Sequence, residues 1–388
     1  MLSHAVVHSP YYREQAWAAR LRAGESLGFR EIPITPRALV RTETKQFYSA
    51  FIPPEDGEVT EKPTAGSTGE PMLVRKTWRH FQINETENQR LKSGWGYAEH
   101  SRVCQIGTRP NDDHPIGAIE EKDQPGGVHV WKLYGAESVS AFDLFRRTSA
   151  SLAKAYPSII LAVLERSLAL SETLPLRLIE TVGEVVPDEL RELVQQIPGC
   201  RLVDIYGCIE TGLIAVQCPR CAAYHPADGH LALEIVADDG RPAAPGEMGR
   251  VIVTPVFNRA MPLIRYETGD YAALAGSNDC PRSPVALSRI VGRERNLFKL
   301  PDGRKILPGL PNRLSIKLGL RKFKLIQTSL TDVELHYIPQ ADGREVAQDL
   351  IQGIIDRYMA PGFKVQCVCV SELPRAPSGK YLIHECLV

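Results

Sequence analysis

The sequence predicts an α/β protein in which a large N-terminal domain of mixed β-sheets and helices is followed by a small α+β C-terminal domain. Its 388 residues suffice for two or three domains of about 150 residues each. Apolar strands at 176–179 and 201–205 flank a helix at 187–197 that starts at a proline. This strand–helix–strand order is typical of a parallel sheet. Near Gly292 the pattern changes to short strands and one helix, which indicates a second domain.

Proline, glycine and apolar spacing predict the other elements of the large domain, which we place at 1–292. In chain order we expect short helices and turns at 10–45 with a break at Pro33 and Pro36, a strand at 72–75, a polar helix at 80–95, a loop at 108–127, a helix at 142–170, and strands at 231–235 and 249–253.

The small domain is expected at 293–388, with the boundary at 292–296. Residues 297–305 alternate around Pro301-Asp302-Gly303, which favours a β-hairpin. We also expect strands at 323–329, 332–338 and 365–370, and a helix whose inward face carries Val346, Leu350, Ile354 and Tyr358.

The composition excludes several classes of function. Lys+Arg and Asp+Glu both number 46, so no overall field favours nucleic acid or an anionic membrane. No apolar run is long enough to span a bilayer, and the N-terminus lacks the pattern of a secretory signal. Nine cysteines are an odd number spread along the chain, which argues against a disulfide scaffold. We therefore expect a cytoplasmic protein with no membrane or nucleic-acid partner.

A glycine-rich segment, Thr64 to Pro71, combines two glycines with two threonines and a serine. Glycines permit tight turns, and hydroxyl and backbone N–H groups donate to phosphates, so we interpret it as a phosphate-binding loop. It is neither a Walker loop nor a dinucleotide fingerprint, because the spacing that each requires is absent. The alternative is a polar turn between a strand and a helix.

Four further polar segments follow in order, and each has a simple structural alternative as a cap, a turn or a solvated terminus. They are Tyr206-Gly207-Cys208-Ile209-Glu210-Thr211, Arg265-Tyr266-Glu267-Thr268-Gly269-Asp270, Val291-Gly292-Arg293-Glu294-Arg295-Asn296 and Pro374-Arg375-Ala376-Pro377-Ser378-Gly379-Lys380.

In this order the five segments resemble the adenylate-forming superfamily of acyl-CoA synthetases, luciferases and adenylation domains. The phenylacetate–CoA ligase branch is most similar, through the segments 8–14, 32–35 and 156–158. The resemblance implies a mobile C-terminal domain and an adenylate-forming carboxylate ligase. Such an enzyme forms an acyl-AMP from ATP and an acid, with aromatic acids favoured, releases pyrophosphate, and passes the acyl group to a thiol.

The thiol acceptor would be coenzyme A or the phosphopantetheine of an acyl carrier protein. Two alternatives stay open: transfer to an amine, as in amide-forming ligases, and a non-catalytic nucleotide-binding relative. The identity of the acid and the oligomeric state, a homodimer included, also stay open.

The resemblance assigns roles residue by residue. Lys380 would contact the α-phosphate and the carboxylate, and Arg293 would lie at the hinge between the domains. Glu210 would bind Mg²⁺, which prefers carboxylate and phosphate oxygens, and Asp270 would accept from both ribose hydroxyls. The remaining nucleotide contacts are implied for Ser67, Thr68 and Gly69 at the β- and γ-phosphates, for Gly183 and Glu184 beside the adenine, for Tyr206 stacked on the adenine, and for Gly207 next to Tyr206.

Several positions depart from the family pattern. Ile209 replaces a threonine, Glu70 a lysine and Glu267 an arginine, and Arg295 and Asn296 stand where the hinge usually has carboxylates. These changes affect the expected rate and second half-reaction more than the fold. The segment around Lys380 is intact, which argues against an inactive enzyme.

A metal site is predicted beside the second segment. Cys218 and Cys221 form a Cys-x-x-Cys, His225 follows, and Cys280 precedes a proline. Four such ligands are typical of structural zinc, and some members of the branch have a similar arrangement. His230 is a reserve ligand. The alternative is three unrelated cysteines and a surface histidine, with Cys104, Cys200, Cys367, Cys369 and Cys386 as packing residues.

The acid pocket is expected between residues 94 and 134 and near Tyr206. Its candidate lining is aromatic: Trp95, Tyr97, Trp131 and Tyr134. The same rings could equally belong to the core.

Overall fold

The fold was analysed in a computed structural model, which describes residues 1–64, 72–97, 101–108, 113–124, 126–135, 138–276, 280–281, 285–308, 318–340, 346–359, 362–373 and 382–388. Ser67, Thr68, Gly69, Glu70 and Lys380 lie outside these ranges. Among the described helices, none combines the length and the apolar character needed to cross a bilayer.

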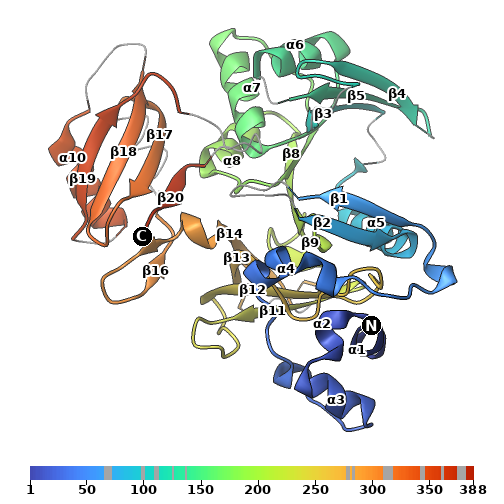
Figure 1. Cartoon of the computed structure of the whole chain (residues 1–388). Coiled ribbons are helices and arrows are strands. Elements are labelled where there is room, and N and C mark those ends of the chain that lie inside the picture. The colour runs from blue at the N-terminus through green and yellow to red at the C-terminus, as the bar shows by residue number, and fades with distance from the viewer. Residues whose placement is uncertain are drawn as a thin grey trace.

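A twelve-stranded mixed sheet organises residues 102–293 (Figure 1). The strands β3, β6, β7 and β8 pair in parallel, as does β5 on the far side of β3, and β8 onward is antiparallel. The strand order is β11 (Leu231–Val236), β12 (Met248–Pro255), β13 (Tyr266–Leu274), β14 (Leu287–Arg293), β10 (Tyr224–Pro226), β9 (Gly212–Gln217), β8 (Arg201–Cys208), β7 (Leu178–Val182), β6 (Leu152–Ala155), β3 (Arg102–Thr108), β5 (Val128–Tyr134) and β4 (Ile119–Gln124).

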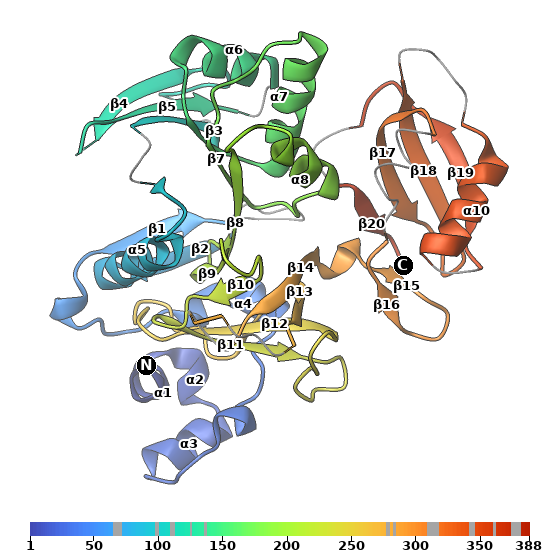
Figure 2. The same cartoon turned by 180° about the vertical axis from the view of Figure 1, so that it is seen from behind.

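Helices cover the parallel part of this sheet on one side (Figure 2). They are α6 (Ser138–Thr148), α7 (Pro157–Ala169) and α8 (Asp188–Gln195). Their apolar faces bury Phe142, Ile159 and Leu190 against sheet residues such as Ile179. The predicted β7–α8–β8 unit is confirmed by the parallel register of Leu178–Val182 on Arg201–Ile205.

The N-terminal segment packs on the antiparallel part of the sheet (Figure 1). Tyr12 and Phe47 are fully buried there, and the Tyr12 hydroxyl accepts from the backbone N–H of Ile264 at 2.8 Å. The elements are α1 (Leu2–His8), α2 (Pro10–Arg13), α3 (Ala16–Arg22) and α4 (Arg37–Thr42), with short 3₁₀ turns at Phe29–Glu31, Thr44–Phe47 and Pro54–Asp56.

A hairpin of β1 (Val59–Pro63) and β2 (Leu73–Thr77) leads into α5 (Trp78–Lys92). The Thr77 side chain caps α5 by accepting from the N–H of His80. The chain between the two strands contains the glycine-rich segment. At its base Thr64 and Met72 exchange hydrogen bonds of 2.9 and 3.1 Å, so a strand, and not a helix, follows the segment.

A separate four-stranded sheet forms the C-terminal part (Figure 1). Its order is β19 (Lys364–Cys369), β18 (Asp332–Pro339), β17 (Leu320–Gln327) and β20 (His384–Cys386), and α10 (Gln348–Tyr358) packs on β19. It has its own apolar core, which includes Leu325, Leu335 and Ile351. The predicted hairpin is present as β15 (Phe298–Lys299) and β16 (Lys305–Ile306). Its Lys305 reaches back to Glu294 at 2.8 Å and to Asp238 at 3.2 Å.

Three predictions about elements are wrong. Residues 108–127 contain β4, because Ile119 to Gln124 pair with β5 in an antiparallel register despite the neighbouring prolines. Residues 142–170 are two helices separated by β6, which the apolar periodicity did not reveal. On α10 the inward residue is Ile351, fully buried, whereas Leu350 is 55% exposed.

Candidate nucleotide and metal sites

Buried polar residues gather where β8, β13 and β14 meet. The Tyr206 hydroxyl, on β8, donates to Asp270 Oδ2 at 2.9 Å, and Arg293 Nε lies 3.0 Å from Asp270 Oδ1. Arg293 Nη1 also donates to the carbonyl of Thr268 at 2.8 Å. Asp270 and Arg293 are directly paired in the β13–β14 register. Sheet pairing therefore brings Asp270 and Arg293 together, and the Tyr206 hydroxyl reaches Asp270 from β8, a strand that pairs with neither β13 nor β14.

Glu210 lies beside this group in the turn between β8 and β9. Its carboxylate is almost completely buried. Arg37 Nη1 lies 2.5 Å from Glu210 Oε1, and the Tyr266 hydroxyl donates to the same oxygen at 3.3 Å. Burial would raise the pKa of Glu210, but the Arg37 guanidinium outweighs it and holds that pKa below its usual value. Glu210 is thus an ionised carboxylate that is paired with the Arg37 guanidinium.

Arg37 was not singled out from the sequence. It begins α4 directly after Pro36, and it also donates to the Tyr266 hydroxyl at 2.9 Å and to the carbonyl of Thr268 at 3.3 Å. The Thr268 carbonyl therefore joins Arg37 to Arg293. Positive residues at the start of short helices are common, so the sequence does not single out Arg37. Its contact with Glu210 becomes visible only in the packing of α4 on the large sheet.

A second missed residue is Lys76 on β2. Burial lowers the pKa of its ammonium to about 8, while the nearby Cys208 and Glu210 act in the opposite direction. Lys76 thus places another positive charge near Glu210, on the strand that follows the glycine-rich segment.

Gly183 and Glu184 directly follow the carboxyl end of β7. Gly183 has φ +84°, which glycine adopts without strain. Glu184 accepts from the backbone N–H of Ser158 at 3.0 Å and from its hydroxyl at 3.1 Å. The carboxylate thereby caps the N-terminus of α7, where acidic groups are stabilised.

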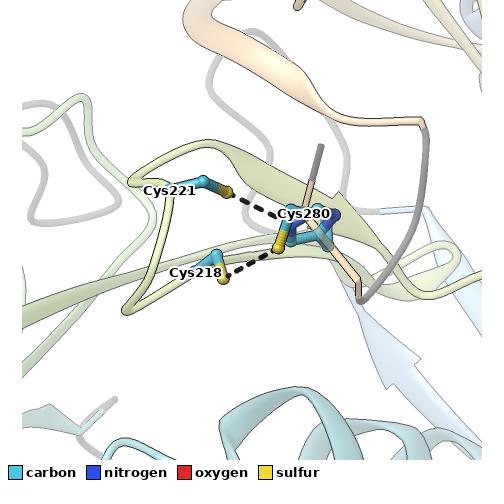
Figure 3. A group of neighbouring side chains, drawn as sticks. Cys218, Cys221 and Cys280 are labelled. Carbon is cyan, nitrogen blue, oxygen red and sulfur yellow. Dashed lines mark hydrogen bonds between the residues drawn. The ribbon is translucent and has the colours of Figure 1, made fainter. Parts of the chain in front are cut away.

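The structure brings the predicted metal ligands together (Figure 3). The ligand atoms of Cys218, Cys221, His225 and Cys280 all lie within 4.8 Å of one another. Cys218 Sγ is 3.8 Å from Cys280 Sγ, and Cys221 Sγ is 3.3 Å from His225 Nε2. Zinc–sulfur bonds of about 2.3 Å at tetrahedral angles would separate two sulfurs by about 3.8 Å, so the four residues fit a zinc ion.

His225 is oriented for this role. Its Nδ1 lies 3.4 Å from the carbonyl of Val285, a contact that commonly fixes a metal-binding histidine. His230 is outside the group, because its Nε2 lies 2.8 Å from the carbonyl of Leu213. Of the cysteines predicted to be packing residues, Cys369 is exposed, which contradicts that prediction.

Of the four aromatic candidates for the acid pocket, Tyr97 lines a cavity on the large sheet, and the other three do not belong to the lining of that cavity. Trp95 is buried with its Nε1 donating to the carbonyl of Gln217 at 2.9 Å. Trp131 belongs to the core under α6 and α7, and Tyr134 stacks on His114. All three rings are buried.

Comparison with known proteins agrees with this architecture, although no protein-family model matches the chain. The phenylacetate–coenzyme A ligase of Escherichia coli (strain K12) is 25% identical over 324 residues, which span 76% of this chain and 69% of that protein. The enzyme of the same name from Pseudomonas putida is 25% identical over 325 residues, with the same coverage.

Solved structures share the fold. A 2-hydroxyisobutyryl-CoA ligase in its postadenylation state superposes with a TM-score of 0.72 over 97% of this chain and 86% of that chain, at 14% identity. The same ligase in an open conformation gives 0.59 over 100% and 89%. An o-succinylbenzoate–CoA synthetase from Bacillus subtilis with AMP gives 0.57 over 84% and 68%, at 16% identity.

The chain therefore has the fold of adenylate-forming ligases. Phenylacetate–coenzyme A ligases are distant homologues over most of its length.

Proposed function

We propose that this protein is an acid–coenzyme A ligase that works through an acyl adenylate. The observation that carries the proposal is the contact network of Tyr206, Asp270 and Arg293 beside the Arg37–Glu210 pair. It sits on an adenylate-forming fold. The network offers one carboxylate for a ribose, one for a cation and two guanidinium groups for phosphates.

Asp270 would bind the ribose. Each carboxylate oxygen can accept more than one hydrogen bond, so the ribose hydroxyls can join the Tyr206 hydroxyl and Arg293. Because the carboxylate is buried and held from two sides, it is already oriented before nucleotide binds. Such preorganisation lowers the free-energy cost of binding.

Glu210 would hold the magnesium ion that accompanies ATP. It fits, because Mg²⁺ is usually bound by one or two carboxylates together with substrate phosphates. When bound, the ion would neutralise charge on the phosphates. Arg37 and Lys76 supply further positive charge close to Glu210.

In the first half-reaction a carboxylate oxygen of the acid bonds to the α-phosphorus, and the bond from that phosphorus to the bridging oxygen of pyrophosphate breaks. Two anions must meet, so the residues act by positioning and charge neutralisation. Lys380 and the segment from Ser67 to Gly69, which lie outside the described residues, are proposed to contact the α-phosphate and the β- and γ-phosphates. In the second half-reaction the thiol sulfur bonds to the acyl carbon, and AMP leaves.

The small sheet is proposed to belong to a mobile domain, residues 293–388, that rotates between the two half-reactions. It has a core of its own and meets the large sheet mainly around Glu294–Asn296 and the β15–β16 hairpin. Because these contacts are few, the small domain can rotate relative to the large one about Arg293.

A structural zinc ion is proposed at Cys218, Cys221, His225 and Cys280. Four protein ligands leave no open position for water, so the metal would stabilise and not catalyse. It would connect the β9–β10 turn to the segment between β13 and β14, and so hold Glu210 and Asp270 in fixed relation. A reducing compartment such as the cytoplasm would keep these thiols available.

The proposed function is tested by ATP–pyrophosphate exchange with a panel of carboxylic acids, followed by AMP release with and without coenzyme A. We expect exchange that requires an acid, and AMP release that coenzyme A accelerates. Absence of exchange, combined with no ATP binding by calorimetry, would contradict the proposal. Acceleration by an amine in place of coenzyme A would redirect it to an amide-forming ligase.

A further inference from the structure

A cavity of about 160 Å³ opens on the sheet face that carries Val103, Val130 and Leu152, which belong to a different core from the residues packed under α6 and α7. Its floor is apolar, from Val103 and Leu152 together with Val128 and Val130, and its polar lining consists of Tyr97, Gln105, Gln124 and Lys154. A cavity of about 150 Å³ accommodates a benzene molecule. The available space therefore suits one six-membered ring or an aliphatic group of similar size.

Along the parallel strands, the cavity lies before their carboxyl ends, where the predicted nucleotide-binding residues gather. Gln105, Lys154 and Glu180 are neighbours in register across β3, β6 and β7. Glu180 precedes Gly183 by three residues, or about 10 Å of extended chain. Ligands of parallel sheets bind at the carboxyl ends of the strands. A molecule in this cavity can therefore point one end toward these carboxyl ends.

The charges beside the cavity do not balance. Glu180 is buried, and it accepts from Lys92 Nζ at 2.9 Å and from the Tyr97 hydroxyl at 2.5 Å. Lys154 Nζ is 3.7 Å from the same carboxylate oxygen, too far for a good hydrogen bond. Two ammonium groups thus share one carboxylate, and Lys154, the more exposed of the two, lines the cavity.

Two further negative charges among the described residues each have a lysine nearby: Glu120 pairs with Lys132, and Glu85 on α5 acts on Lys92. Lys122 pairs with Val130 in the β4–β5 register and so lies on the cavity side. On the same face Lys132 is matched by Glu120 at 3.2 Å. Four lysines, Lys92, Lys122, Lys132 and Lys154, thus stand against three glutamates, Glu85, Glu120 and Glu180. A partly buried cation is stabilised by a paired anion, so the cavity favours an anionic group beside Lys154.

Resting on the proposed function, we propose that this cavity is the acid-binding pocket and that the substrate is a small carboxylic acid carrying a second anionic group. The reacting carboxylate points to the edge of the sheet, toward Glu210 and Asp270. The second anion pairs with Lys154, and Gln105 and the Tyr97 hydroxyl are within the same lining. Lys154 is then a specificity-determining residue.

The test compares matched acids that differ only by the second carboxylate: benzoate with terephthalate, and phenylacetate with 4-carboxyphenylacetate. Pyrophosphate exchange gives kcat/KM for each, and calorimetry without ATP gives binding. For the wild-type protein we expect each diacid to exceed its monoacid by about ten- to a hundredfold, the range of one hydrogen bond to a charged group. Lys154→Met should abolish that ratio, and Lys154→Arg should retain part of it. Lys45→Met, which removes an exposed positive charge in the Thr44–Phe47 turn and not on this face, is the matched control and should preserve the ratio.

Exchange with monoacids that equals exchange with diacids would overturn this inference and leave the proposed function intact. A preference for diacids that survives in Lys154→Met would also overturn it. If no acid of either kind supports exchange and ATP does not bind, the proposed function fails, and this inference fails with it. Circular dichroism and thermal unfolding of Lys154→Met and Lys154→Arg establish that a lost preference does not reflect a lost fold.

Discussion

Arg37 Nη1 and Glu210 Oε1 are 2.5 Å apart, so the carboxylate proposed to bind magnesium already carries a cation from the chain itself. The pair is largely buried, with the Glu210 side chain 3% and the Arg37 side chain 22% exposed. A buried carboxylate left without a counter-ion would be strongly destabilised. Arg37 therefore keeps Glu210 ionised before nucleotide arrives, and its guanidinium can pair with phosphates once magnesium has bound.

The first prediction concerns Arg37→Met. It should weaken ATP binding about ten- to a hundredfold, because one hydrogen bond to a charged group is lost. The same variant should need less free Mg²⁺ for half-maximal ATP binding, because a repelling charge is removed from Glu210. Calorimetry of ATP binding across a magnesium series measures both. Lys45→Met, which removes an exposed positive charge just beyond α4, is the control, and equal behaviour of the two variants would contradict the role of Arg37.

The second prediction concerns Asp270. Replacing it with alanine removes the proposed acceptor for the ribose and the carboxylate 3.0 Å from Arg293. ATP affinity should fall by at least a hundredfold, since more than one charged hydrogen bond is lost at about 1.5–3 kcal/mol each. Tyr206→Phe removes only the hydroxyl that contacts Asp270 and should weaken binding much less. An ATP Kd unchanged in Asp270→Ala would remove this residue from the nucleotide site.

The third prediction concerns Lys380, which lies outside the described residues. If its ammonium neutralises the α-phosphate during attack, Lys380→Ala should lower pyrophosphate exchange by several orders of magnitude. ATP binding should change little, because most of the proposed nucleotide contacts come from residues of the large sheet. The two measurements are made on the same preparation. Pyrophosphate exchange at the wild-type rate in Lys380→Ala would contradict the proposed role of Lys380 at the α-phosphate.

The fourth prediction concerns zinc. Purified protein should contain about one zinc ion per chain, as expected for one four-ligand site. Cys218→Ser and Cys280→Ser should each lower the zinc content and the Tm, because metal binding contributes to folding. Cys369→Ser replaces an exposed cysteine outside the group and should change neither. Full zinc content in Cys280→Ser would show that this cysteine is not a ligand.

The fifth prediction is a pH dependence from Asp204. Burial raises the pKa of this carboxyl to about 6, although the hydroxyls of Thr181 and Tyr224 donate to it. Between its usual value of 3.8 and about 6, the folded state binds more protons than the unfolded state. The free energy of unfolding contributed by Asp204 is therefore complete below that window and is lost as the pH rises through it.

Asp204→Asn should flatten this part of the stability profile, measured by urea unfolding from pH 4 to pH 7. The variant and the wild type should differ most in slope between pH 4 and 6. Parallel profiles over that range would contradict the raised pKa.

Much of the central fold was predictable because its signals are local. The strand–helix–strand unit at β7, α8 and β8 follows from apolar runs on either side of Pro187. The failures have a local cause too. β4 is polar and mostly exposed, so its strand character comes from pairing with β5 and leaves little trace in hydrophobicity. The apolar residues of β6 continue the spacing of α6 and α7, which hid a buried strand between two helices.

By itself, the sequence determined which residue types are available for chemistry and in what order: the glycine-rich segment, Glu210, Asp270, Arg293, and the Cys-x-x-Cys with its histidine. The tertiary structure decided which of them meet. Arg37 contacts Glu210, His225 and not His230 lies with the three cysteines, and Lys154 lines a cavity. These choices depend on the register of strands and the packing of helices far apart in the chain, as in the contact of Arg37 with Tyr266 across 229 positions. Local spacing carries no information about such pairings, because they form only when the sheet buries its faces.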